Sequence, residues 1–163
     1  LPIAFIPIDS IEGTDVENAS RFNLDEAAKV VDIVQKLLES GDILPTEIGI
    51  ITPYNGQVRL LTDHFDRLGG TGKEEPFSGL EIRSVDGYQG REKEVIIFST
   101  VRANDQGELG FLTDRRRLNV ALTRAKRGLI IVGNPHTLKR DNTWNSWLEW
   151  IEEKELMAWH YRQ

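Results

Sequence analysis

The stretch Val95-Ile-Ile-Phe-Ser-Thr-Val101 decides the fold class, because it is an apolar run without the alternation of a half-exposed strand. Continuous runs of this kind are typical of parallel strands in a sheet that helices cover on both faces. Two more runs of this kind, Glu47–Thr52 and Gly128–Gly133, flank it along the chain. We therefore expect a mostly parallel sheet that is buried on both sides.

The segments around these runs alternate between strand and helix. Ile3–Ile8 and Leu80–Val85 are predicted as further strands, and Pro7 favours a position at the sheet edge for the first. Apolar residues at helical spacing, with candidate caps at Asn23 and Asp114, predict four helices. These are expected over residues 24–40, 54–68, 115–125 and 142–156. The pattern predicts an α/β domain with right-handed crossovers and a binding site at the carboxyl ends of the strands.

Length and composition fit one globular domain over residues 1–163, with 39% hydrophobic and 28% charged residues. The absence of cysteine excludes a disulfide scaffold, a thiolate zinc site and a cysteine nucleophile. No apolar run approaches the ~20 residues of a membrane span, and no signal-peptide pattern follows Leu1. We expect an intracellular protein, cytoplasmic or nuclear, without a membrane partner, and a chain that is part of a longer protein.

Charge is unevenly distributed around a net value of −6. Residues 1–26 contain six acids and one base, whereas residues 114–127 contain six bases and one acid. The acidic, polar residues 9–23 are expected to form a loop. The overall balance argues against a nucleic-acid binder, but a basic stripe on an acidic body suits local anion binding. An exposed basic helix face is the commoner explanation for such a run.

Polar side chains follow two of the predicted strands. Thr52 and Ser84 carry small hydroxyls, which commonly hold nucleic-acid phosphates without reading sequence. Tyr54 suits stacking on a base. Each of these residues, taken alone, is more often a turn or capping residue.

A glycine-containing segment separates the third predicted strand from Val95. Gly87 and Gly90 allow the backbone to approach a ligand closely. Glu92 beside them suits a sugar hydroxyl, as acidic residues do in dinucleotide-binding folds. A solvated turn of mixed charge remains the alternative.

The basic segment 115–126 is predicted to be helical. Arg117 and Arg124 are seven residues apart, about two turns, which places both on one side of such a helix. An arginine fork suits phosphate oxygens, although a helical arginine alone is usually a surface residue. The three histidines, His64, His136 and His160, lack metal-ligand spacing, so no metal site is predicted.

Together, three segments resemble the motifs of the second RecA-like lobe of superfamily 1 helicases. The resemblance is closest to the nonsense-mediated-decay helicases (regulator of nonsense transcripts), with senataxin-like helicases as near relatives. GIITPYNGQ at 49–57 is similar to motif IV, SVDGYQGREKE at 84–94 to motif V, and RRLNVALTRAK at 116–126 to motif VI. VRAN at 101–104 and GFL at 110–112 also match the family.

The resemblance implies a single RecA-like domain and assigns roles to its matching residues. Arg124 resembles the arginine finger that reaches the γ-phosphate of ATP, and Glu92 resembles a glutamate that contacts the ribose. Gln89 and Gly90 complete the implied ATP-binding residues. Arg91 is similar to a residue that links the two sites. The positions implied to lie near single-stranded nucleic acid are Thr52, Pro53, Tyr54, Ser84, Asp86 and Arg91.

The resemblance also implies partners. ATP with Mg²⁺ is the implied cofactor, and single-stranded RNA or DNA is the implied ligand of a monomeric protein. The Walker A and Walker B motifs that bind phosphate and magnesium belong to a first RecA-like lobe and are absent here. We therefore expect the isolated chain to be inactive as an ATPase.

Two other classes of function compete with this one. A non-enzymatic nucleic-acid or protein-binding module that retains the helicase fold is the alternative, and the intact Glu92 and Arg124 argue against it. A Rossmann-type oxidoreductase requires a G-x-G-x-x-G turn after the first strand, and residues 9–23 contain none.

Overall fold

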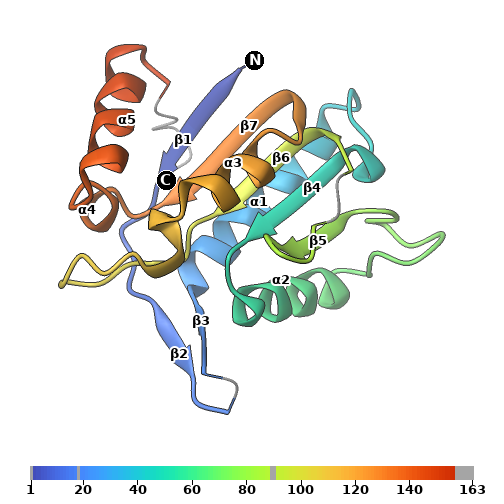
Figure 1. Cartoon of the computed structure of the whole chain (residues 1–163). Coiled ribbons are helices and arrows are strands. Elements are labelled where there is room, and N and C mark those ends of the chain that lie inside the picture. Colours follow the sequence, from blue (N-terminus) through green and yellow to red (C-terminus); the bar gives the residue numbers. More distant parts are fainter. Residues whose placement is uncertain (1, 18, 89–90, 157–163) are drawn as a thin grey trace.

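A computed structural model describes residues 2–17, 19–88 and 91–156. Its centre is a five-stranded sheet in which every neighbouring pair of strands is parallel (Figure 1). The strand order across the sheet is β1 (Ile3–Pro7), β7 (Ala125–Gly133), β6 (Lys93–Ser99), β4 (Ile48–Thr52) and β5 (Glu81–Ser84). The prediction of a parallel α/β sheet is confirmed, and β1 with its Pro7 lies at the edge as expected.

Helices cover both faces of the sheet, as the continuous apolar strands predict. One core cluster joins the sheet to α1 (Leu24–Glu39) and α2 (Asn55–Arg67). A second cluster joins the opposite face to α3 (Arg115–Leu122) and α5 (Asn142–Glu153). The short elements are η1 (Pro45–Glu47), η2 (Gly110–Thr113) and α4 (Pro135–Leu138). This layered arrangement is that of a single RecA-like domain.

Helix α1 begins and ends where the sequence predicts. The side chain of Asn23 accepts a hydrogen bond from the Glu26 N–H and so caps the first turn. Gly41 follows the last turn at φ +77°, a left-handed conformation that glycine adopts without strain.

The expectation of a loop over residues 9–23 is wrong in part. An antiparallel hairpin of β2 (Gly13–Asp15) and β3 (Ser20–Phe22) projects from the sheet at that point (Figure 1). The hairpin is held by tertiary contacts, because the Ser20 hydroxyl accepts a hydrogen bond from Gly56 N–H in α2 at 2.9 Å. Such contacts override the local polar composition, which carries no alternation typical of a strand.

The predicted end of the basic helix is also wrong. Helix α3 stops at Leu122, and Ala125 already pairs with Lys93 as the first residue of β7. Arg124 therefore lies in the turn after α3 and shares no helical face with Arg117. Sheet pairing, rather than helical spacing, determines where the helix ends. The Lys93 N–H donates to the Arg124 carbonyl at 3.0 Å.

Candidate nucleotide and nucleic-acid sites

The predicted site residues lie at two opposite edges of the sheet. Thr52 and Ser84 end β4 and β5, and so lie at the carboxyl edge. Glu92 and Arg124 directly precede β6 and β7, and so lie at the amino edge. The expectation that the candidate residues all follow the strands is therefore wrong for Glu92 and Arg124.

The amino edge brings together the segments that contain Glu92 and Arg124. The hydrogen bond from Lys93 N–H to the Arg124 carbonyl ties the two segments together. The Arg124 side chain is half-buried and its Nε donates to the Val120 carbonyl at 3.2 Å, whereas Glu92 is exposed. Gln89 and Gly90 lie outside the described residues. A guanidinium and a carboxylate just before two adjoining strands suit the phosphate and ribose of a nucleotide.

Tyr88 packs beneath this edge and was missed by the sequence reasoning. Its ring belongs to the core cluster under α3, and burial, followed by the charge of Glu81, raises the pKa of its hydroxyl to about 12. A side chain at Gly49 would come within 3.0 Å of that hydroxyl oxygen, so a larger residue there would displace the Tyr88 side chain. A glycine inside a buried strand is the one sequence signal that indicates such a close approach.

Arg91 contacts Glu81 on the outermost strand. Its Nη1 lies 2.9 Å from the Glu81 carboxylate, which the Nζ of Lys93 also approaches at 3.3 Å. Arg91 remains 76% exposed. Arg91 lies on the segment that runs from the carboxyl end of β5 to the amino end of β6, and it reaches back to Glu81, the first residue of β5.

Two adjoining hollows share Asn55: the first follows the end of β4 at the carboxyl edge, and the second runs from there along β5 toward the amino edge. The first has a volume of about 420 Å³ and includes Pro53, Tyr54 and Arg59 in its lining. The second has a volume of about 400 Å³, and its lining extends from Ser84 and Gly87 past Arg83 to Glu81 and its partner Arg91. The two hollows combine arginines, an aromatic ring and a hydroxyl, which is the chemistry of a groove for single-stranded nucleic acid. Sequence reasoning missed Arg59 and Arg83, which look like ordinary surface charges.

Three of the residues predicted to lie near single-stranded nucleic acid have defined surroundings at this edge. Thr52 is fully buried, and among the described residues its hydroxyl oxygen has no hydrogen-bond partner. The Ser84 hydroxyl accepts from Gly87 N–H at 3.0 Å, which closes the turn after β5. Asp86 holds Arg117 through both carboxylate oxygens, and the Arg117 guanidinium also lies 4.3 Å from the Phe111 ring centroid. Arg117 is thus engaged within the domain.

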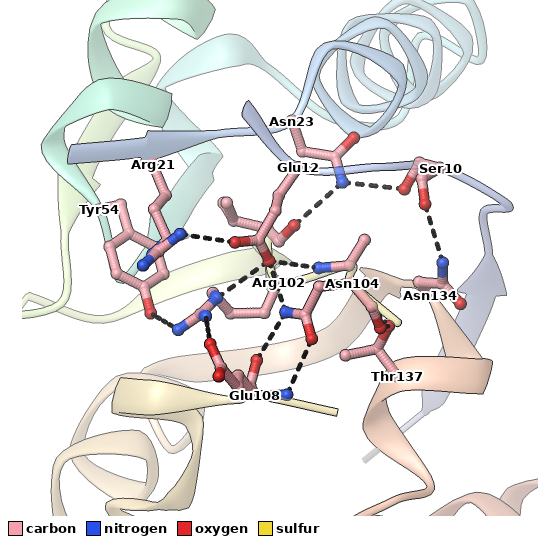
Figure 2. Close-up of polar contacts among 12 residues, drawn as sticks. Ser10, Glu12, Arg21, Asn23, Tyr54, Arg102, Asn104, Glu108, Asn134 and Thr137 are labelled. Carbon is pink, nitrogen blue, oxygen red and sulfur yellow. Dashed lines mark hydrogen bonds and ion pairs between the residues drawn. The ribbon is translucent and has the colours of Figure 1, made fainter. Parts of the chain in front are cut away.

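A polar network centred on Glu12 lies beside Tyr54 (Figure 2). One Glu12 oxygen accepts from Arg102 Nε, Ala103 N–H and Asn104 Nδ2, and the other accepts from Arg21 at 2.8 Å. Partial burial disfavours the charged carboxylate, but the hydrogen bonds from Asn104, Ala103 and Arg102 outweigh it and lower the pKa of Glu12. In the sequence, VRAN is only a family match, and Glu12 lies in the segment expected to be a loop.

A second polar cluster, fully buried, lies under the same edge. Glu26 accepts hydrogen bonds from the Ser99 hydroxyl and the Val101 N–H, and Asn23 Nδ2 donates to the Val101 carbonyl. Gln57 donates to Ser99 and to the backbone of Asn23. Burial raises the pKa of Glu26 to about 8, despite the hydrogen bonds that favour its charged form.

Comparison with known proteins identifies the family. The profile of the AAA domain family matches residues 1–136. The chain belongs to this family. Across residues 2–156, leaving out the undescribed positions 18, 89 and 90, this AAA domain has no helix long and apolar enough to cross a membrane.

The relatives of this AAA domain bear out the resemblance inferred from the motifs. Regulator of nonsense transcripts 1 of Dictyostelium discoideum is 45% identical over 96% of the chain and 12% of its own length. An uncharacterized ATP-dependent helicase of Methanocaldococcus jannaschii is 44% identical over 95% of the chain and 21% of its own length. The ATP-dependent helicase NAM7 of Saccharomyces cerevisiae is 42% identical over 97% of the chain and 16% of its own length. The chain thus spans about an eighth to a fifth of these relatives.

Proposed function

We propose that this domain is the second motor lobe of an ATP-dependent helicase that acts on single-stranded RNA or DNA. The observation that carries the proposal is the placement of two candidate sites on opposite edges of one rigid sheet, joined by residues 84–93. That segment starts at Ser84, beside the two hollows, and ends at Lys93, which is bonded to Arg124. A motor requires such a link, because nucleotide-driven movement at one edge must reach the nucleic-acid grip at the other.

At the amino edge, Arg124 would act as the arginine finger and Glu92 would contact the ribose, with Gln89 and Gly90 completing the ATP site. The described residues fit only part of a nucleotide. They include no group of three or more histidine, aspartate or glutamate side chains placed to hold a metal ion. Mg²⁺ and the phosphate-binding loop would therefore come from a first RecA-like lobe, and the isolated chain would not hydrolyse ATP.

The single-stranded nucleic acid would follow the two adjoining hollows from the carboxyl edge along β5 to Arg91. Tyr54 and Pro53 would contact bases, and Ser84 with Arg91 would contact phosphates. Thr52 and Asp86 would support this surface from beneath and beside it, because Thr52 is buried and Asp86 is held by Arg117. The net charge of −6 is compatible with binding, because only the groove needs to be positive.

The cycle implied by this arrangement is closure and opening of a cleft between two lobes. ATP bound between the lobes supplies the chemistry, and Arg124 would stabilise the charge that develops on the transferred phosphoryl group. Because closure changes how this lobe faces the other, the grip on the strand would alternate. The proposal includes a monomeric protein located inside the cell.

Arg124→Ala tests the proposal in the protein that carries both lobes, with ATP hydrolysis measured with and without single-stranded RNA. We expect kcat to fall by ~10³-fold while KM for ATP changes little, because the finger acts in the transition state. Arg127→Ala is the matched control, since Arg127 lies three residues away and pairs with Glu94 on the surface. Equal turnover in wild type and Arg124→Ala would remove Arg124 from catalysis. RNA binding without any turnover in the wild type would favour the non-enzymatic binding module.

A further inference from the structure

The loop after β6 contains a strained residue at a defined position. Val101 adopts φ +69°, a left-handed conformation that is rare and costly for a β-branched side chain. Its N–H donates to buried Glu26 at 2.9 Å, and its carbonyl accepts from buried Asn23 at 3.0 Å. Strain of this kind persists only where the surroundings fix it, and it concentrates at functional sites.

The residue that this strained turn presents is Arg102. Its side chain is only 5% exposed and lies between the hairpin and the end of β4. The Nε donates to Glu12 at 3.0 Å, and Nη1 donates to the Tyr54 hydroxyl at 3.2 Å. The guanidinium carbon also lies 5.9 Å from the centroid of the Tyr54 ring, so Arg102 contacts both the ring and its hydroxyl (Figure 2).

Tyr54 is fixed at both of its ends. Its backbone is the N-cap position of α2, and its carbonyl accepts from the N–H groups of Gln57 and Val58. The hydroxyl end is held by Arg102. A side chain at Gly110 would come within 2.5 Å of Arg102 Nη1 and 3.1 Å of the Tyr54 hydroxyl, so the GFL segment leaves room for this contact.

We infer that Arg102 is a positioning residue of the nucleic-acid groove, which holds the ring of Tyr54 in the orientation on which a base stacks. The inference rests on the proposed function, because it assigns Tyr54 to that groove. Its physical basis is preorganisation: a ring that is already immobilised loses less conformational freedom when a base binds. Glu12 in turn orients Arg102 and is itself held by Arg21, Ala103 and Asn104.

A role in positioning differs measurably from a role in stability alone. Removing the guanidinium should weaken stacking on Tyr54 and leave nucleotide binding at the opposite edge unchanged. The test uses the two-lobe protein and a single-stranded RNA that contains one 2-aminopurine, whose fluorescence is quenched when the base stacks. Affinity is measured by anisotropy, stacking by quenching, and KM for ATP in the absence of RNA serves as the stability-sensitive readout at the other edge.

The variants are Arg102→Gln, Tyr54→Ala, the double variant and Tyr54→Phe. We expect Arg102→Gln to lower RNA affinity about fivefold and to reduce quenching, with KM for ATP unchanged. In the Tyr54→Ala background, Arg102→Gln should have no further effect, because residues that act as one unit are not additive. Arg67→Gln, an exposed arginine at the end of α2 that bonds the Asp63 carbonyl, is the matched control.

Tyr54→Phe tests the same contact with the smallest structural change, because it removes only the hydroxyl that Arg102 bonds and retains the ring. We expect it to reduce quenching in the same direction as Arg102→Gln, by a smaller amount. Full additivity of Arg102→Gln with Tyr54→Ala, or unchanged quenching in both Arg102→Gln and Tyr54→Phe, would overturn the inference alone. No effect of Tyr54→Ala on RNA binding would overturn the proposed groove, and the inference with it.

Discussion

The two edges of the sheet are built differently. At the carboxyl edge, Asn23, Glu26 and Gln57 are fully buried and hydrogen-bonded to one another and to the loop after β6. At the amino edge, Arg91 and Glu92 are exposed, and Arg91 relies on a surface ion pair. The domain therefore preorganises its carboxyl edge by itself, whereas the amino edge is an open surface. An edge of the second kind suits a site that is completed by another lobe.

The largest expected effect at constant pH is at the centre of the buried cluster. Asn23→Ala removes the cap of α1 together with hydrogen bonds to Ser10 and Val101. We expect the free energy of unfolding to fall by about 3 kcal/mol, because a cap and several buried polar groups lose their partners together. Urea unfolding of the 163-residue chain measures it. Asn145→Ala is the control, because the side chain of this half-buried asparagine on α5 bonds the exposed Glu149. An equal loss in both variants would mean that the buried cluster adds nothing.

The same cluster predicts a pH dependence of stability. The pKa of Glu26 is raised from 4.5 to about 8 on folding, so the folded protein holds a proton that the unfolded chain releases. The contribution of Glu26 to the free energy of unfolding is therefore fully present below about pH 4.5 and is lost as the pH rises toward 8. We expect the free energy of unfolding of the wild type, relative to Glu26→Gln, to fall by an amount of order 4 kcal/mol over this range.

Urea unfolding at several pH values checks this expectation, and the difference between the two proteins removes the contribution of all other carboxylates. A constant difference across the range would show that Glu26 ionises in the folded protein as it does in water. A difference that changes in the opposite direction would mean that the hydrogen bonds from Ser99 and Val101 outweigh burial.

The sequence predicts the sheet well because each of its buried strands is a continuous apolar run, and the run at Val95 identifies the parallel class by itself. It fails where tertiary contacts decide the structure. Ala125 fits a helical spacing and joins β7 because Lys93 pairs with it. The motifs likewise identify Arg124 and Tyr54 as candidates, and the strand before Tyr54 predicts the carboxyl edge for it, but nothing in the sequence indicates the edge on which Arg124 lies. That edge depends on the direction of α3, which returns the chain from the carboxyl edge to the amino edge.

Buried polar residues are the other class that the sequence does not reveal. Glu12, Glu26 and Arg102 look like surface charges when only composition and periodicity are considered. Their partners are distant in the chain: Glu12 bonds residues about 90 positions away, and Glu26 bonds Val101, 75 positions away. The match at VRAN was the available signal, and only the folded structure shows that it carries a left-handed valine and the arginine that contacts Tyr54.

The smallest expected effect on stability is at the amino edge of the sheet. Arg91→Ala breaks an exposed ion pair with Glu81, and Lys93 remains within 3.3 Å of that carboxylate to replace it. We therefore expect the free energy of unfolding to change by less than about 0.5 kcal/mol. Binding of single-stranded RNA should respond more strongly, because Arg91 lines the hollow beside Ser84 and faces the path proposed for phosphates.

If Arg91 contacts one phosphate, its loss should reduce the slope of log affinity against log salt concentration by about 1, and affinity should weaken equally for all sequences. Anisotropy titrations of the two-lobe protein over a series of salt concentrations measure the slope. Arg127→Ala controls for loss of charge, since Arg127 also forms an exposed pair, with Glu94, away from both hollows. Equal slopes for the two variants would mean that Arg91 acts only through net charge. A loss of stability as large as that of Asn23→Ala would remove the contrast between the edges, because it would make the exposed pair as important to the fold as the buried cluster.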